Sequence, residues 1–171
     1  MIPEPWLRGP LQDVNPLLAP VLRALQQAQE DLEKFCSRCT DEEIWTRPYG
    51  LAPLGFHLRH IAGSLDRLTT YLEGDQLTES QFAFLHSEMD AGGTRPELLC
   101  LVADAIARAS QVVTGLDPDS LTASRTVGRK NFPATVIGLS IHLAEHSQRH
   151  VGQAITVCNL LLALRQLKYS A

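Results

Sequence analysis

The sequence predicts an all-α fold, a four-helix bundle in which residues 1–171 form a single domain. Apolar residues recur every three or four positions in four long stretches, which is the pattern of amphipathic helices. Strand patterns, by contrast, are almost absent. The chain is 44% hydrophobic and long enough to bury a core without disulfides or a structural metal. Amphipathic helices bury their apolar faces by packing against one another, so four of them predict a bundle.

The first helix is predicted over residues 16–38, where large apolar side chains recur at helical spacing. A second helix begins near Pro53, because proline is tolerated in the first turn. It ends before Gly74, since glycine commonly follows the last turn of a helix. Beside its apolar stripe runs a polar row at helical spacing, made of His60, Ser64, Arg67 and Tyr71. A polar row next to a core indicates either a solvent edge or a buried site.

The middle of the chain contains the third helix of the bundle. Residues 75–93 are predicted to form a long link with one short helical turn. Thr94 and Glu97 then form a capping box, in which each side chain satisfies a backbone N–H of the other residue. The third helix begins there and stops at Gly115.

A fourth helix is predicted over residues 132–166, after a link with an extended piece near residues 126–127. The second and third connections exceed the length that adjacent antiparallel helices need, so at least one is expected to cross over. A second apolar row on the fourth helix consists of Ala144, Val151, Ile155, Cys158 and Leu162. One bundle core cannot cover both faces, so this row meets another element or a second subunit. We favour a symmetric homodimer.

Composition argues against nucleic-acid and membrane partners. The net charge is −4, whereas phosphate binding needs a basic surface. The N-terminus lacks the basic start and apolar run of a signal peptide, and no apolar stretch could span a bilayer. We therefore expect a cytoplasmic protein. Residues 121–171 nevertheless carry six basic side chains against one acidic one. This suggests an anionic or thiolate-like ligand, although a solvated basic face explains the charge equally well.

Four cysteines are too few and too scattered for a disulfide framework. Cys36 and Cys39 form a CxxC pair, but no second pair exists to complete a zinc ribbon. A redox role is conceivable from the spacing. Because the pair lies near the end of a helical pattern, we interpret both residues as buried free thiols.

Three histidines, His142, His146 and His150, recur every four residues in the fourth helix. They lie on one face about one turn apart, on the apolar stripe that faces the core. His146 and His150 could supply two ligands to one ion, but His142 would lie two turns from His150. Three neutral imidazoles suit zinc, nickel or another borderline divalent ion and leave coordination positions open.

The third ligand is expected from another part of the chain. The candidates among the other histidines are His57, His60 and His86. We favour His60, because it begins the polar row of the second helix. The ordinary alternative is that these histidines are polar groups bordering a core, with no metal-binding role.

The segment His146-Ser-Gln-Arg-His150-Val-Gly-Gln153 resembles the HxxxHxGQ signature on the last helix of the DinB/YfiT-like superfamily. The segment His60-Ile-Ala, followed by Asp66-Arg67, looks like that family's ligand motif on the second helix. Chain length and helix layout agree as well. The resemblance implies a bundle, usually dimeric, whose three histidines bind a divalent metal. By this resemblance, the expected metal ligands are His60, His146 and His150.

Further residues are expected to line the pocket or support the ligands. Helix geometry selects four of them: His57, Ser64, Arg67 and His142. Gln153, within the signature, lies one turn beyond His150 on the inward stripe and is expected to contact a ligand or line the pocket.

The resemblance implies a metal-dependent enzyme acting on a small molecule. Known family members include S-transferases that use low-molecular-weight thiols of the bacillithiol or mycothiol type. We therefore expect a thiol-dependent S-transferase or else a hydrolase. The alternative is a non-catalytic metal-binding helical protein with a structural or vestigial site. A zinc protease of the HExxH type is excluded, because Ser147 follows His146.

Overall fold

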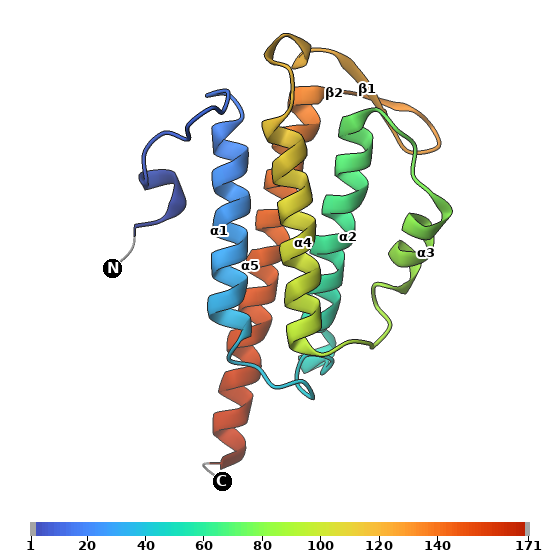
Figure 1. Ribbon diagram of the computed structural model, residues 1–171. Coiled ribbons are helices and arrows are strands. Elements are labelled where there is room, and N and C mark those ends of the chain that lie inside the picture. The colour runs from blue at the N-terminus through green and yellow to red at the C-terminus, as the bar shows by residue number, and fades with distance from the viewer. Residues whose placement is uncertain (1–2, 170–171) are drawn as a thin grey trace.

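Four long helices form the body of the protein, and a short fifth helix lies beside them (Figure 1). The structure is a computed structural model and describes residues 3–169. Its helices are α1 (Ala19–Cys36), α2 (Leu54–Glu73), α3 (Glu79–Ser87), α4 (Arg95–Thr114) and α5 (Val136–Tyr169). The prediction of a helical bundle is confirmed. None of the described helices combines the length and apolarity needed to cross a membrane.

The bundle has a crossover connection between its second and third long helices. In Figure 1, α1 and α5 run downward, whereas α2 and α4 both run upward. The link through α3 returns the chain to the end at which α2 began, so α2 and α4 are parallel neighbours. Each of α1 and α2 packs against both α4 and α5, which places α1 and α2 across the bundle from each other. The predicted crossover is thus present in the second connection.

Helix ends follow the local signals in the sequence. Gly74 adopts a left-handed conformation, with φ of 96°, and closes α2 where the sequence predicts its end. The Thr94–Glu97 capping box starts α4 as expected. The prediction of one short helical turn between α2 and α4 is wrong, because α3 is a helix of 9 residues. Thr78 and Gln81 form another capping box, a start signal that the sequence prediction overlooked.

A small hairpin precedes α5. Strand β1 (Ser124–Val127) pairs antiparallel with β2 (Phe132–Thr135), in a register that sets Ser124 opposite Thr135. The extended piece predicted near residues 126–127 lies in β1. The predicted helix start at Phe132 is wrong, because Phe132–Thr135 is a strand and α5 begins at Val136. Over only four residues, the spacing of apolar side chains does not distinguish a helix from a strand.

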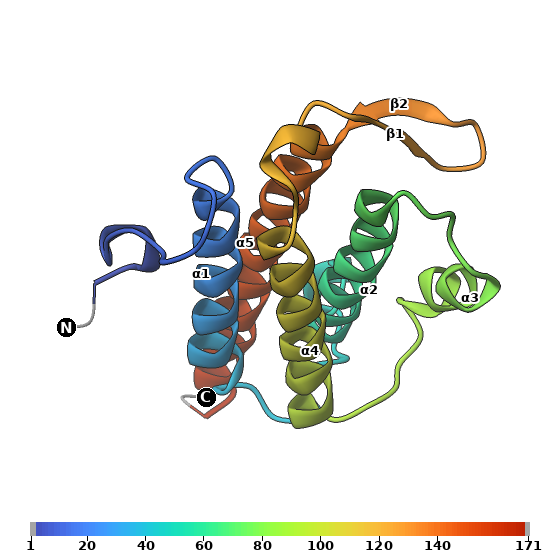
Figure 2. The ribbon, with the colours of Figure 1, turned by 45° about the horizontal axis from the view of Figure 1, so that its top comes forward.

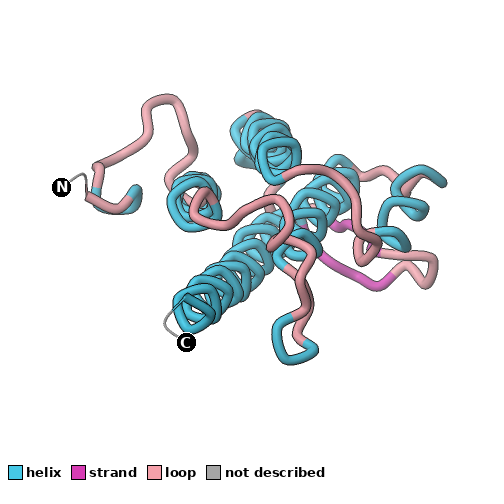
Figure 3. Tube along the Cα trace, turned by 90° about the horizontal axis from the view of Figure 1, so that it is seen from below, coloured by secondary structure: helices cyan, strands magenta, loops and turns pink. Residues whose placement is uncertain are grey.

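The hairpin and α3 lie on the same side of the bundle. From below, they are on one side and the N-terminal segment is on the other (Figure 3). The hairpin extends past the end of α2 toward α3 (Figure 2). There the guanidinium of Arg129 lies over the ring of Phe82, 4.7 Å from its centre.

The second apolar row of α5 is partly covered by α1 of the same chain, with Ala144, Ile155 and Leu162 only partly buried. Val151 and Cys158 are buried, and the Cys158 sulfur lies 3.6 Å from the Cys36 sulfur. The Gln148 side chain also donates a hydrogen bond to the backbone oxygen of Ala24 in α1. The buried part of the row is therefore accounted for within one chain. The homodimer remains a prediction.

The cysteines Cys36, Cys39 and Cys158 are free thiols buried in the core. Hydrogen bonding to Cys36 and burial raise the pKa of Cys158 to about 12. A thiol with such a pKa stays protonated at neutral pH and is a poor nucleophile. The interpretation of the CxxC pair as buried structural thiols is confirmed.

Replacing Leu65 by alanine should lower the free energy of unfolding by about 2–5 kcal/mol, because it leaves a cavity in the core. The Leu65 side chain is 0% exposed in α2. Urea denaturation followed by circular dichroism measures the change. Leu167→Ala serves as the control, since Leu167 is 66% exposed. It should change stability by less than about 0.5 kcal/mol. Equal losses in the two variants would contradict this packing.

Candidate metal centre

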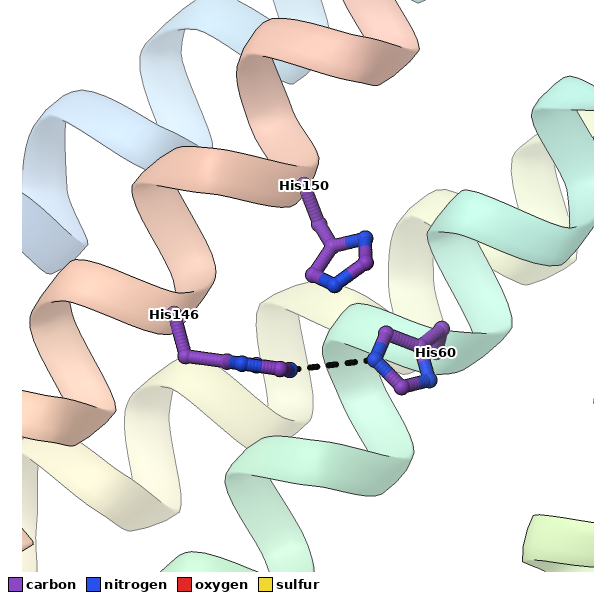
Figure 4. Close-up of side chains that lie close together, drawn as sticks. All are labelled: His60, His146 and His150. Atoms are coloured by element: carbon purple, nitrogen blue, oxygen red, sulfur yellow. Dashed lines mark hydrogen bonds between the residues drawn. The ribbon is translucent and has the colours of Figure 1, made fainter.

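Helices α2 and α5 bring three imidazoles together in the interior of the bundle. His146 and His150 lie one turn apart on α5, and His60 faces them from α2 (Figure 4). One ring nitrogen from each histidine lies within 4.8 Å of the others. Nε2 of His60 and Nε2 of His146 are 3.0 Å apart. The structure thus assembles the three residues that the sequence singles out, from segments 86 residues apart.

This donor set fits a divalent ion of the zinc type. Nitrogen ligands bind zinc at about 2.0–2.1 Å, which places tetrahedral donors about 3.3 Å from one another. Small movements of the rings would therefore close the group around an ion. All three histidines are only partly buried. Among residues 3–169, no carboxylate or thiol belongs to this compact group, so three protein ligands would leave coordination positions open.

The buried carboxylate of Glu88 holds His60 in place. Its Oε2 lies 2.7 Å from Nδ1 of His60, and its Oε1 accepts a hydrogen bond of 2.7 Å from Arg67. Burial would raise the pKa of Glu88, but the hydrogen bonds from His60 and Arg67 outweigh burial and hold it below the ordinary value.

Glu88 was not predicted from the sequence. It lies at the C-terminal end of α3, in a segment where the sequence indicates a link rich in acidic residues. Only 2% of its surface is exposed, whereas the neighbouring Asp90 is exposed. No periodic pattern distinguishes these two acids, because the position of α3 against α2 depends on tertiary contacts.

The imidazoles of His146, His150 and the neighbouring His57 are neutral at physiological pH. Burial, followed by repulsion from the other imidazoles, lowers the pKa of His146 and of His57 to about 4. Burial and the proximity of His60 and Arg149 have the same effect on His150, whose pKa is also about 4. A neutral imidazole can offer a lone pair to a metal, whereas a protonated one cannot. Protons would thus compete with a metal ion only in acid.

A cavity of about 440 Å³ lies at the start of α2, and none of the three candidate metal ligands lines it. Its lining includes His57, Arg149 and Gln153, three polar residues near His150. The His57 ring centre is 5.9 Å from that of His150. Nδ1 of His57 is buried without a hydrogen-bond partner, and so is Nδ1 of His150. Unsatisfied buried nitrogens at a cavity are costly unless a ligand or water completes their hydrogen bonds.

The other predicted pocket residues have different surroundings. The hydroxyl of Ser64 is buried and donates to the backbone oxygen of Ile61, so it does not face the cavity. Arg67 contacts Glu88 and supports the site from behind His60. His142 is exposed and lies at the edge of the group, with Nδ1 3.0 Å from Glu145. Of the three α5 histidines spaced four residues apart, His142 is therefore the one that lies at the surface.

The metal-free protein should lose stability as the pH falls from about 6.5 to about 4. Unfolded histidines bind protons near pH 6.5, whereas His57, His146 and His150 bind them only near pH 4 in the folded chain. The unfolded state therefore binds more protons across this window, and proton binding favours it. Above pH 6.5 the three imidazoles are neutral in both states and contribute no pH dependence.

Urea midpoints at pH 7 and pH 5 measure this loss. His146→Gln should reduce the difference between the two midpoints, since it removes one of the three groups. A difference that is unchanged in this variant would contradict the assignment.

Comparison with known proteins places the chain in a family. The sequence profile of the DinB superfamily matches residues 24–154, whereas a search of curated proteins gave no significant match.

Among solved structures, a conserved protein from Enterococcus faecalis is 20% identical, with a TM-score of 0.65 over 84% of this chain and 96% of that one. A DinB-like protein from Bacillus cereus is 14% identical, with a TM-score of 0.64 over 82% and 89%. YfiT from Bacillus subtilis, described as a probable metal-dependent hydrolase with an unusual four-helix bundle topology, is 16% identical, with a TM-score of 0.62 over 91% and 93%. These likenesses show a shared fold. With the profile matched over most of its length, the chain belongs to the DinB superfamily.

Proposed function

We propose that this protein is a divalent-metal-dependent enzyme in which His60, His146 and His150 bind the ion. The observation that carries the proposal is the convergence of three ring nitrogens within 4.8 Å of one another. The low pKa of His146 and His150, about 4 in each case, keeps their lone pairs available at neutral pH. Imidazole ligands favour borderline ions, so zinc or nickel is the proposed metal.

The reaction proposed is the transfer of a low-molecular-weight thiol to an electrophilic small molecule. A divalent ion at such a site supplies Lewis acidity, which makes a thiol or a water molecule nucleophilic at neutral pH. A thiol has a pKa near 8.5 and needs little further help to lose its proton, whereas water has one near 15.7. Within residues 3–169 no carboxylate oxygen joins the three nitrogens as a base. Both oxygens of Glu88 are already hydrogen bonded. This shortage of a free carboxylate favours a thiol substrate.

The cavity beside His150 would hold the substrate in this proposal. Gln153 can donate and accept hydrogen bonds, and the neutral His57 ring offers a further polar contact. Arg149 lies at the same cavity and is paired with Glu145 on the surface. Its guanidinium could exchange this partner for an anionic group of the substrate.

A metal-dependent hydrolase is the second candidate. The description of YfiT as a probable metal-dependent hydrolase supports it through the shared fold. In that case a water molecule takes the place of the thiol. A non-catalytic protein with a structural metal is the remaining alternative, and it would bind the ion without any turnover.

His150→Ala should abolish both stoichiometric metal binding and turnover. Elemental analysis measures the metal, and the loss of thiol in the presence of alkyl or epoxide electrophiles measures transfer. His86→Ala is the matched control, because His86 is exposed on α3 outside the group of ligands. It should keep both properties.

The outcomes separate the three alternatives. Turnover that requires both metal and thiol supports the transferase, and turnover with water alone supports the hydrolase. Metal binding without either activity supports the structural role. Wild-type protein that binds no divalent ion would refute the metal site itself.

A further inference from the structure

We propose that Glu88 is a positioning residue of the metal centre, whose carboxylate holds His60 in the tautomer with the proton on Nδ1. Nε2 of His60 then faces His146 and His150 as a lone-pair donor. The consequence for metal affinity rests on the proposed function. The tautomer itself does not, because it is a property of the metal-free chain.

The Glu88 carboxylate makes its contacts inside the protein, away from solvent. Only 2% of its surface is exposed, and each carboxylate oxygen has one partner. Oε2 lies 2.7 Å from Nδ1 of His60, and Oε1 lies 2.7 Å from a guanidinium nitrogen of Arg67. The Arg67 charge balances the carboxylate and permits its burial in ionised form. With the carboxylate ionised, only the imidazole can donate in the contact with His60.

The opposite side of the His60 ring is consistent with this tautomer. Nε2 of His60 lies 3.0 Å from Nε2 of His146, close enough for a hydrogen bond between the two rings. One of these nitrogens must donate and the other accept. In the proposed tautomer the His60 proton is on Nδ1, so His146 would be the donor in the metal-free chain. An ion bound at the centre would replace this proton as the partner of the His60 lone pair.

Helix α2 holds the segment that carries Glu88 at points on both sides of it. Arg59 donates to the Ser87 hydroxyl at 2.9 Å and to the backbone oxygen of Asp90 at 2.7 Å. The guanidinium of Arg59 also lies over the Phe84 ring, 5.1 Å from its centre. These contacts fix the chain immediately before and after Glu88, so its carboxylate reaches His60 from an anchored backbone.

Gly63 provides the space that the carboxylate occupies on α2. A Cβ atom at this position would lie 2.5 Å from Oε1 of Glu88 and 2.8 Å from Nη1 of Arg67. Real Cβ atoms do not approach other atoms so closely, so any larger residue would displace this ion pair. A glycine in the interior of a helix is less favourable than alanine. Here it permits the close approach of Glu88.

A purely structural role for Glu88 makes a different prediction. If the carboxylate only joined α3 to α2 through Arg67, its removal would lower stability and leave the His60 proton and the metal affinity unchanged. In metal sites, loss of the carboxylate behind a histidine typically weakens binding about 10–100-fold, because the ligand loses its orientation and basicity.

The first experiment measures the His60 tautomer in the metal-free wild-type protein. Long-range ¹H–¹⁵N correlation spectra at pH 7.5 distinguish a protonated ring nitrogen from an unprotonated one, and a His60→Gln variant assigns the signals. The proposal requires the proton on Nδ1 of His60. A wild-type His60 protonated on Nε2 would overturn it, with no variant needed.

The second experiment compares Glu88→Gln with Glu73→Gln. Glu73 is also paired with an arginine, Arg108, but lies on the exposed side of α2 away from the histidines. Zinc affinity is measured by competition with a chromogenic chelator. Glu88→Gln should weaken zinc binding about 10–100-fold and allow the other His60 tautomer to appear, whereas Glu73→Gln should do neither.

Three outcomes separate this inference from the proposed function. Equal zinc affinity in wild type and Glu88→Gln, with both folded by circular dichroism, would refute the positioning role. Wild-type protein that binds no zinc or nickel would refute the proposed function, while the tautomer measurement would still decide the role of Glu88. If Glu88→Gln does not fold, Gly63→Ala displaces the carboxylate without removing it and should weaken zinc binding in the same direction.

Discussion

The structure depends on the burial of α5 on two faces. Its apolar residues pack against α1 on one face and α2 on another, so α5, like α4, joins the two helices that lie across the bundle from each other. Side chains such as Leu143 and Ala154 are fully buried along it. This packing fixes the rotation of α5 about its axis, and the rotation in turn directs His146 and His150 toward α2. The geometry of the histidine group is therefore a consequence of hydrophobic packing.

Charge pairing lowers the free-energy cost of burying polar groups at that interface. A lone buried carboxylate would be strongly unfavourable, but Glu88 has Arg67 on one oxygen and His60 on the other. His146 and His150 are partly buried in their neutral form, which needs less hydration than a charged form. The segment that carries Glu88 is fastened by Arg59 on both sides. Helix α3 thus brings a carboxylate into contact with His60, although it lies outside the four-helix body.

The sequence predicts those features that arise from local periodicity. The amphipathic stretches, the Thr94 capping box and the glycine end of α2 are all properties of a few neighbouring residues. The placement of His60 opposite the α5 pair followed from its polar row and from the family resemblance. Features that depend on contacts between distant segments were not predictable in this way. Glu88 became distinctive only once α3 packed against α2, and the second apolar row of α5 turned out to meet α1.

The crossover has an electrostatic consequence at the end of the bundle near the hairpin. Because α2 and α4 are parallel neighbours, their C-terminal ends lie side by side, and each carries the partial negative charge of its helix dipole. Arg125, in β1, donates a hydrogen bond of 2.8 Å to the backbone oxygen of Leu72 in the last turn of α2. A cation at such a position is typically worth about 0.3–1 kcal/mol. The hairpin between α4 and α5 therefore places the positive charge of Arg125 at the C-terminal end of α2. This charge offsets the repulsion between the dipoles of the two parallel helices.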